Sequence, residues 1–216
     1  MVFNLSEHSS LAQVYLKELR DTRIQADRFR FRKNLERLGQ IMAYEISKAL
    51  PFELSSVTTP LAVTEVSIPS EQPVLCSILR AGVPYFQGFV SFFDHSDCAF
   101  VGAYRGRHQD DFSFEVELDY VACPDLTGRT VILIDPMLAT GKSIVKAYET
   151  LKKWGTPAAV HIAAVIAAPE GIDWIESVLP EADIWTCAID LELNDHFYIV
   201  PGLGDAGDLA YGAKRD

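Results

Sequence analysis

The sequence has too little positive charge for a protein whose main partner is nucleic acid. Its 216 residues include 19 lysines and arginines against 30 aspartates and glutamates, a net charge of −11. Contacts to a phosphate backbone need clustered Lys and Arg, so we expect no nucleic-acid partner. A local basic pocket for a small anionic substrate is still compatible with this balance.

Long apolar runs are also missing. No segment of the chain is long enough to span a bilayer, which predicts no membrane partner. The first ten residues, MVFNLSEHSS, lack the basic and apolar regions of a secretory signal. We therefore expect a soluble, cytoplasmic protein.

Several common catalytic and metal-binding patterns are absent. No C-x-x-C pair occurs, so the cysteines are predicted to be thiols in a reducing compartment: Cys76, Cys98, Cys123 and Cys187. The histidines lack metal-ligand spacing: His8, His95, His108, His161 and His196. No G-x-S-x-G motif supplies a nucleophile. We therefore expect neither a protein-bound metal centre nor covalent catalysis.

What remains is an ordinary globular composition, 49% hydrophobic and 23% charged, which suits a single domain over residues 1–216. Helical spacing over about 10–50 predicts two helices that end before Pro51. In a core of about 74–190, predicted strands (74–79, 98–103, 131–135, 159–167, 184–189) alternate with predicted helices (82–93, 141–154, 171–179). Near-continuous apolar strands in such an alternation predict an α/β fold with a parallel sheet flanked by helices on both faces.

Two other segments are predicted to be irregular. Residues 105–113 are polar and suit a mobile loop or hairpin, and residues 198–212 are rich in Gly, Asp and Pro and are predicted to be loop. In open parallel sheets ligands bind beyond the carboxyl ends of the strands. Arg80, Arg105 and Asp135 each follow or end such a strand and are therefore candidate site residues.

The segment from Val131 to Ser143 carries the strongest signal. An apolar strand ends in Asp135, a short loop follows, and a helix begins near Gly141. Loop N–H groups and a helix N-terminus can hold a phosphate, and Asp135 can accept hydrogen bonds from a sugar diol. The end of the segment also matches a nucleotide-triphosphate P-loop, but Pro136 replaces that motif's first glycine. An ordinary strand-to-helix turn capped by Asp135 is the remaining alternative.

This segment resembles the 5-phosphoribosyl-1-pyrophosphate (PRPP) loop of type I phosphoribosyltransferases, and specifically D-P-M-L-A-T-G-G-S of the uracil-specific members. Asp135–Gly141 and Ser143 match, and Lys142 stands where the family has a second glycine. The resemblance implies that the loop binds ribose and its 5-phosphate. The implied PRPP-binding residues in the loop are Asp135, Pro136, Met137, Leu138, Ala139, Thr140, Gly141, Lys142 and Ser143.

Further matches cover most of the chain. Ile78–Gly82 resembles the family's pyrophosphate-binding segment, and Tyr104-Arg105 resembles the start of its flexible loop, although Gly106–Gln109 departs from the acidic continuation. Other matches are Leu19-Arg20-Asp21, Phe29-Arg30, Ala43-Tyr44-Glu45, Thr59-Pro60-Leu61 and Ala167–Gly171. The resemblance makes Arg80 and Arg105 candidates for stabilising the leaving pyrophosphate.

The segment Tyr198–Asp208 is similar to the family's uracil-binding segment. Its implied uracil-binding residues are Ile199, Gly204, Asp205 and Ala206. Exposed backbone in a Gly-rich loop can offer donors to O2 and O4 and an acceptor to N3–H. Asp205 is also a candidate for PRPP binding and catalysis, at the uracil ring or through magnesium.

Taken together, the resemblance implies a type I phosphoribosyltransferase-like sheet with a small hood made from the terminal segments. It implies transfer of phosphoribosyl from PRPP to uracil, with Mg²⁺ carried mainly by PRPP, a homo-oligomer (dimer or tetramer) and, as in some relatives, a GTP effector. Two alternatives stay open: an RNA-binding pyrimidine regulator of the same fold and a non-catalytic nucleotide-binding relative. Physical grounds alone do not exclude cytosine, orotate or another base.

Overall fold

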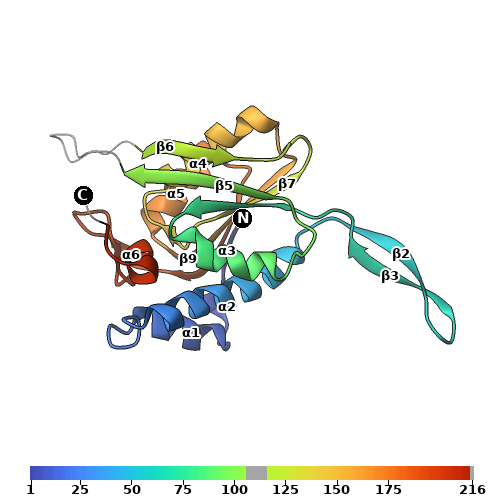
Figure 1. Cartoon of the computed structure of the whole chain (residues 1–216), viewed down its shortest axis with the longest axis horizontal. Coiled ribbons are helices and arrows are strands. Elements are labelled where there is room, and N and C mark those ends of the chain that lie inside the picture. Colours follow the sequence, from blue (N-terminus) through green and yellow to red (C-terminus); the bar gives the residue numbers. More distant parts are fainter. Residues whose placement is uncertain (106–115, 215–216) are drawn as a thin grey trace.

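The centre of the molecule is a mixed sheet, mainly parallel, in the order β1-β10-β9-β7-β4-β5-β6 (Figure 1). The computed structural model describes residues 1–105 and 116–214, and of residues 103–105 and 116–119 it describes only the backbone. The sheet strands are β1 (Val2–Asn4), β4 (Val74–Leu79), β5 (Cys98–Arg105), β6 (Val116–Ala122), β7 (Thr130–Ile134), β9 (Ala159–Ala167) and β10 (Asp183–Ile189). Only the edge pair β5–β6 is antiparallel among the printed pairings of this path, so the expected parallel sheet is confirmed with one antiparallel strand added.

Helices cover both faces of the sheet, as the apolar strands predicted (Figure 1). On one face lie α1 (Ala12–Arg20), α2 (Arg28–Ser47) and α3 (Gly82–Val90), and on the other lie α4 (Lys142–Leu151) and α5 (Pro169–Val178). Alternate strand residues enter the two cores: Leu75 and Ile132 pack with α1–α3, whereas Cys76 and Leu133 pack with α4 and α5. This burial on both sides fixes the strands whose ends carry the site.

The close packing of α2 on α3 depends on two glycines. A Cβ atom at Gly39 would collide with the carbonyl oxygen of Tyr85, and one at Gly88 would collide with the carbonyl oxygen of Glu36. The backbones of the two helices therefore meet directly, and α2 packs closely against α3.

Two short helical turns complete the N-terminal and α4 regions: η1 (Leu5–Glu7) and η2 (Lys152–Trp154). The predicted pair of N-terminal helices is confirmed as α1 and α2, and the chain leaves α2 before Pro51 as expected.

All four cysteines are free thiols. Within the described residues, no helix is both long enough and apolar enough to cross a membrane.

The segment 198–212 was predicted to be loop, and this was wrong. It contains the strand β12 (Ile199–Val200), paired with β11 (Glu192–Leu193), and the helix α6 (Ala206–Tyr211). The helix forms because Asp205 caps it, with Oδ1 accepting a hydrogen bond from the N–H of Asp208 at 2.9 Å. Figure 1 shows α6 next to α2, and Nη1 of Arg32 donates to the carbonyl oxygen of Ala210 at 2.7 Å, so the two ends of the chain meet in the expected hood.

An antiparallel hairpin of β2 (Phe52–Thr58) and β3 (Val63–Pro69) was not predicted. It extends away from the sheet and helices (Figure 1). Large apolar side chains are exposed along both of its strands and at its tip: Phe52, Leu54, Val57, Leu61, Val63, Val66 and Ile68. Water-exposed apolar residues on both faces of an isolated hairpin give it little stability of its own.

Candidate active site

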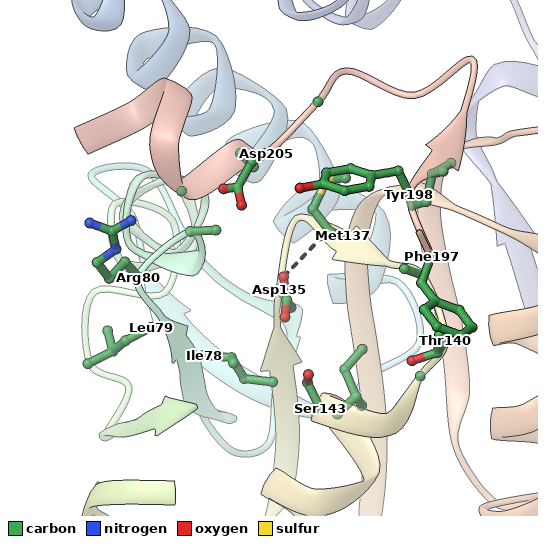
Figure 2. Close-up of a pocket in the computed structure, with 18 of the residues that line it drawn as sticks. Ile78, Leu79, Arg80, Asp135, Met137, Thr140, Ser143, Phe197, Tyr198 and Asp205 are labelled. Atoms are coloured by element: carbon green, nitrogen blue, oxygen red, sulfur yellow. Dashed lines mark hydrogen bonds between the residues drawn. The ribbon is translucent and has the colours of Figure 1, made fainter. Parts of the chain in front are cut away.

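A pocket of about 530 Å³ lies at the carboxyl ends of β4 and β7, where the fold class predicts ligand binding (Figure 2). Its walls come from three segments: residues 78–81 at the end of β4, the 135–144 segment after β7, and the C-terminal segment from Phe197 to Gly207. Lys214 also lines it. The structure thus brings together three regions that are far apart in the chain.

The segment after β7 forms one side of this pocket. Asp135 lies at the end of the strand, and its Oδ1 accepts a hydrogen bond from the N–H of Met137 at 3.1 Å (Figure 2). Met137 and Leu138 form a short strand, β8, on β9, because the carbonyl groups of Pro136 and Leu138 accept bonds from that strand and the residue after it. The turn is therefore anchored on the sheet and holds Asp135 at the pocket.

The helix α4 begins directly after this turn. Gly141 precedes it with φ of 74°, a left-handed conformation that favours glycine, and no side chain caps the helix. The first N–H groups of a helix carry partial positive charge, so this end suits a phosphate. Thr140 and Ser143, two of the predicted PRPP-binding residues, carry hydroxyl donors and both line the pocket.

Apart from Arg105, whose side chain the structure does not describe, the predicted PRPP residues divide into two groups. Those that line the pocket are Arg80, Asp135, Met137, Ala139, Thr140, Gly141, Ser143 and Asp205. Pro136 and Leu138 are buried beneath it, and Lys142 is exposed at the start of α4 without lining it. Contact with PRPP stays a prediction for the residues of both groups.

Arg80 lies at the edge of the pocket and is paired with an acid from the hood. Its Nη2 donates to Oδ1 of Asp208 at 2.9 Å, and the two side chains are 40% and 36% exposed. Figure 2 shows the guanidinium group directed toward α6 rather than toward Asp135. Asp208 lies in the predicted Tyr198–Asp208 segment but was given no role, since nothing local in the sequence shows that it meets Arg80.

Arg105 and the Gly106–Gln109 stretch cannot be placed in the same way. The backbone of Arg105 ends β5, but its side chain lies outside what the structure describes, as do residues 106–115. Its predicted contact with pyrophosphate stays a prediction.

All four predicted uracil-binding residues line the pocket: Ile199, Gly204, Asp205 and Ala206. Figure 2 places Asp205 across from Asp135, with Tyr198 and Phe197 along the adjoining wall. Phe197 has a positive φ of 59°, which is uncommon for a bulky residue, and it was not predicted. The turn before β12 is held by Asn194, whose Oδ1 accepts the N–H groups of His196 and Tyr198 at 3.0 and 2.9 Å.

Comparisons with known proteins agree with this geometry. A family model described as uracil phosphoribosyltransferase matches residues 6–213. A Porphyromonas gingivalis protein named uracil phosphoribosyltransferase is 48% identical over 214 residues, which cover 99% of both chains. One of the same name from Pyrococcus furiosus is 43% identical over 209 residues, covering 95% of this chain and 88% of that protein.

The fold has a close counterpart among solved structures. A protein from Aquifex aeolicus superposes with a TM-score of 0.86 at 32% identity, covering 98% of both chains. The match of the family model from residue 6 to residue 213 includes the PRPP-like turn, the pocket and the hood. The chain therefore belongs to the uracil phosphoribosyltransferase family.

Proposed function

We propose that the chain transfers the 5-phosphoribosyl group from PRPP to uracil and releases uridine monophosphate (UMP) and pyrophosphate. The observation that carries the proposal is the meeting of the PRPP-like turn at Asp135 with the segment Ile199–Ala206 across one pocket. A sugar phosphate on one side and a flat base on the other would then lie side by side. Membership of the family supports the same reaction.

In this proposal the protein acts mainly by orienting the two substrates and stabilising the leaving group. The start of α4, with Thr140 and Ser143, binds the 5-phosphate, and Asp135 accepts hydrogen bonds from the ribose diol. The bond from ribose C1 to a pyrophosphate oxygen breaks as N1 of uracil bonds to C1, and the transition state has oxocarbenium character. The bond from N1 to its hydrogen breaks as well, and that proton passes to the departing pyrophosphate or to solvent. Arg80, and Arg105 from β5, supply positive charge to the departing pyrophosphate.

Magnesium fits this site as an ion that arrives with PRPP. Among the described residues no group of three or more His, Cys, Asp or Glu side chains could hold a metal ion by itself. The pocket does offer the hard carboxylate oxygens of Asp135 and Asp205, which suit Mg²⁺ held largely by substrate oxygens and water. When bound, the ion would neutralise charge on the pyrophosphate.

The base would be selected by backbone groups of the Ile199–Ala206 segment. Uracil presents an N3–H donor and an O4 acceptor, whereas cytosine presents an N3 acceptor and an N4 amine donor. Two mismatched buried hydrogen bonds, at about 1–3 kcal/mol each, give discrimination on the order of 10² or more.

The decisive test is UMP formation from uracil and PRPP with Mg²⁺, with cytosine and orotate as competitors and GTP as a candidate effector. A kcat/KM ratio for uracil over cytosine near one would contradict the assigned base. A lack of turnover together with tight RNA binding at physiological salt would favour the regulator alternative. Nucleotide binding without turnover would favour the non-catalytic one.

We also propose that the chain works as a homo-oligomer. The β2–β3 hairpin exposes apolar side chains to water, and two aromatic residues that contact each other, Tyr44 and Phe92, are also 53% and 43% exposed. A second copy of the same chain is the commonest partner for such a surface. Light scattering of wild-type protein against a Leu54→Lys, Val63→Lys double variant would test this, and a wild-type monomer would refute it.

A further inference from the structure

The Leu19-Arg20-Asp21 motif matched the family, but the proposed function gives Arg20 no task. The structure places Arg20 at the end of α1, against the C-terminal segment. Its Nη1 donates to Oδ2 of Asp190 at 2.8 Å and its Nη2 donates to Oδ1 of the same carboxylate. This is a two-bond pair in which the Asp190 side chain is 5% exposed.

The pair also holds the backbone of Gly202 on both sides of the residue. Nη1 of Arg20 donates to the Gly202 carbonyl oxygen at 2.9 Å, and the Gly202 N–H donates to Oδ2 of Asp190 at 2.9 Å. Gly202 itself has a φ of 60°, and a Cβ there would collide with the carbonyl oxygen of Ile199. The conformation of this turn is therefore specified by one arginine, one aspartate and one glycine.

A third side chain holds the next residue. Nε2 of Gln25 donates to the Leu203 carbonyl oxygen at 3.1 Å and to the Leu19 carbonyl oxygen at 2.7 Å. Asp190 is in turn fixed to the sheet, because its N–H donates to the Ala167 carbonyl oxygen at 2.8 Å. The turn is thus tied both to α1 and to the central strands.

Gly202 and Leu203 lie between Ile199 and Gly204, the residues on either side that line the pocket. The pocket is not lined by Arg20, Asp190 or Gln25, so these side chains contact the turn on the side away from the pocket. Backbone groups at 199 and 204–206 can read a base only if the turn between them is held in place.

We propose that Arg20 and Asp190 form a positioning clamp that sets base affinity and base choice by fixing the turn at Gly202. This rests on the proposed function, since it assumes that the Ile199–Ala206 segment binds the base. The clamp residues are positioning residues, and their effect falls on uracil rather than on PRPP.

The test uses Arg20→Lys, which keeps the charge but loses the planar two-bond geometry. We expect the KM for uracil to rise by about tenfold or more, the scale of losing about 1.4 kcal/mol, while the KM for PRPP stays within about twofold, well below that scale. The preference for uracil over cytosine should fall. Asp190→Asn, which keeps an acceptor for the Gly202 N–H, is a second variant should the first fold poorly.

Arg30→Lys is a matched control. Arg30 makes the same kind of two-bond pair with Glu18, at 2.8 Å for both bonds, and joins α1 to α2 without a hydrogen bond to the described part of the C-terminal segment. It should lower the melting temperature and leave the KM for uracil unchanged. An equal rise in that KM for Arg30→Lys, or none for Arg20→Lys and Asp190→Asn, would overturn the clamp.

Amide hydrogen exchange separates failure of the clamp from failure of the proposed function. Exchange over residues 199–206 should speed up in Arg20→Lys and not in Arg30→Lys, whether or not uracil is the substrate. If exchange is faster in Arg20→Lys but the wild-type protein makes no UMP, the proposed function is refuted, while the finding that Arg20 fixes the turn still stands. Unchanged exchange in both clamp variants would refute the clamp.

Discussion

The contact between Arg80 and Asp208 predicts how strongly the protein binds PRPP. If Arg80 serves the leaving pyrophosphate, it must first leave Asp208, and the pair then opposes binding. Both side chains are more than one-third exposed, so the pair contributes only about 0.2–1 kcal/mol. Replacing Asp208 with Asn removes that opposition, and we expect the KM for PRPP to fall by roughly 1.5- to 5-fold.

The assay is initial-rate kinetics with uracil saturating and PRPP varied, at two ionic strengths. The gain should shrink at higher salt, because exposed charges are screened. Asp97→Asn is the control, since it breaks a comparable 3.0 Å pair with Arg129 that does not line the pocket. Arg80→Ala should lower turnover with little change in melting temperature.

A rise in the KM for PRPP in Asp208→Asn would refute this reasoning. It would mean that Asp208 holds Arg80 in its working position instead of competing for it. Unchanged turnover in Arg80→Ala would show that Arg80 has no role at the leaving group.

Three further predictions concern carboxylates. Asp205→Asn should keep the α6 cap and the melting temperature but reduce turnover, whereas Asp205→Ala should reduce both the melting temperature and turnover, because alanine cannot cap the helix. Equal turnover in Asp205→Asn and wild type would show that Asp205 has no part in catalysis. Asp135→Asn should raise the KM for PRPP by roughly 10- to 150-fold, the effect of losing a charged acceptor worth about 1.5–3 kcal/mol. Wild-type kinetics in this variant would show that Asp135 does not bind the ribose. The guanidinium of Arg30 and the amide of Asn34 donate to Glu18 and lower its pKa to about 2. Stability from this carboxylate is therefore present above pH 4.5 and lost as the pH falls toward 2, so Glu18→Gln should flatten that part of the melting-temperature profile.

The central strands could be predicted well from the sequence. Both β4 and β9 have the predicted bounds, because each is a nearly continuous apolar run, interrupted only by Ser77 or His161, that is buried from both sides. By contrast β1 has only three residues and is a strand because it pairs with β10, which no local pattern indicates. The β2–β3 hairpin lacks a buried face, so its side chains show no clean alternation.

The candidate site divides in the same way. The motif residues around Asp135 and Asp205 could be named because their types and order are local. The pairs that organise them could not, since Arg80 is 128 residues from Asp208 and Arg20 is 170 from Asp190. The helix α6 was missed because its cap, Asp205, stands in a stretch whose Gly and Pro content is typical of loops.

The clamp at Gly202 also bears on how the protein acquires its site during synthesis. Arg20 emerges from the ribosome early, but its partners lie 170 and 182 residues later. Partly folded intermediates are common in chains of this length, so the strands from β4 to β9 can begin to pair before these partners appear. The turn at Gly202 therefore closes late, because its contacts with Arg20 have a very high sequence separation and are slow to form. A nascent chain ending after β10 would hold the turn around Asp135 and Thr140 without the wall that faces it.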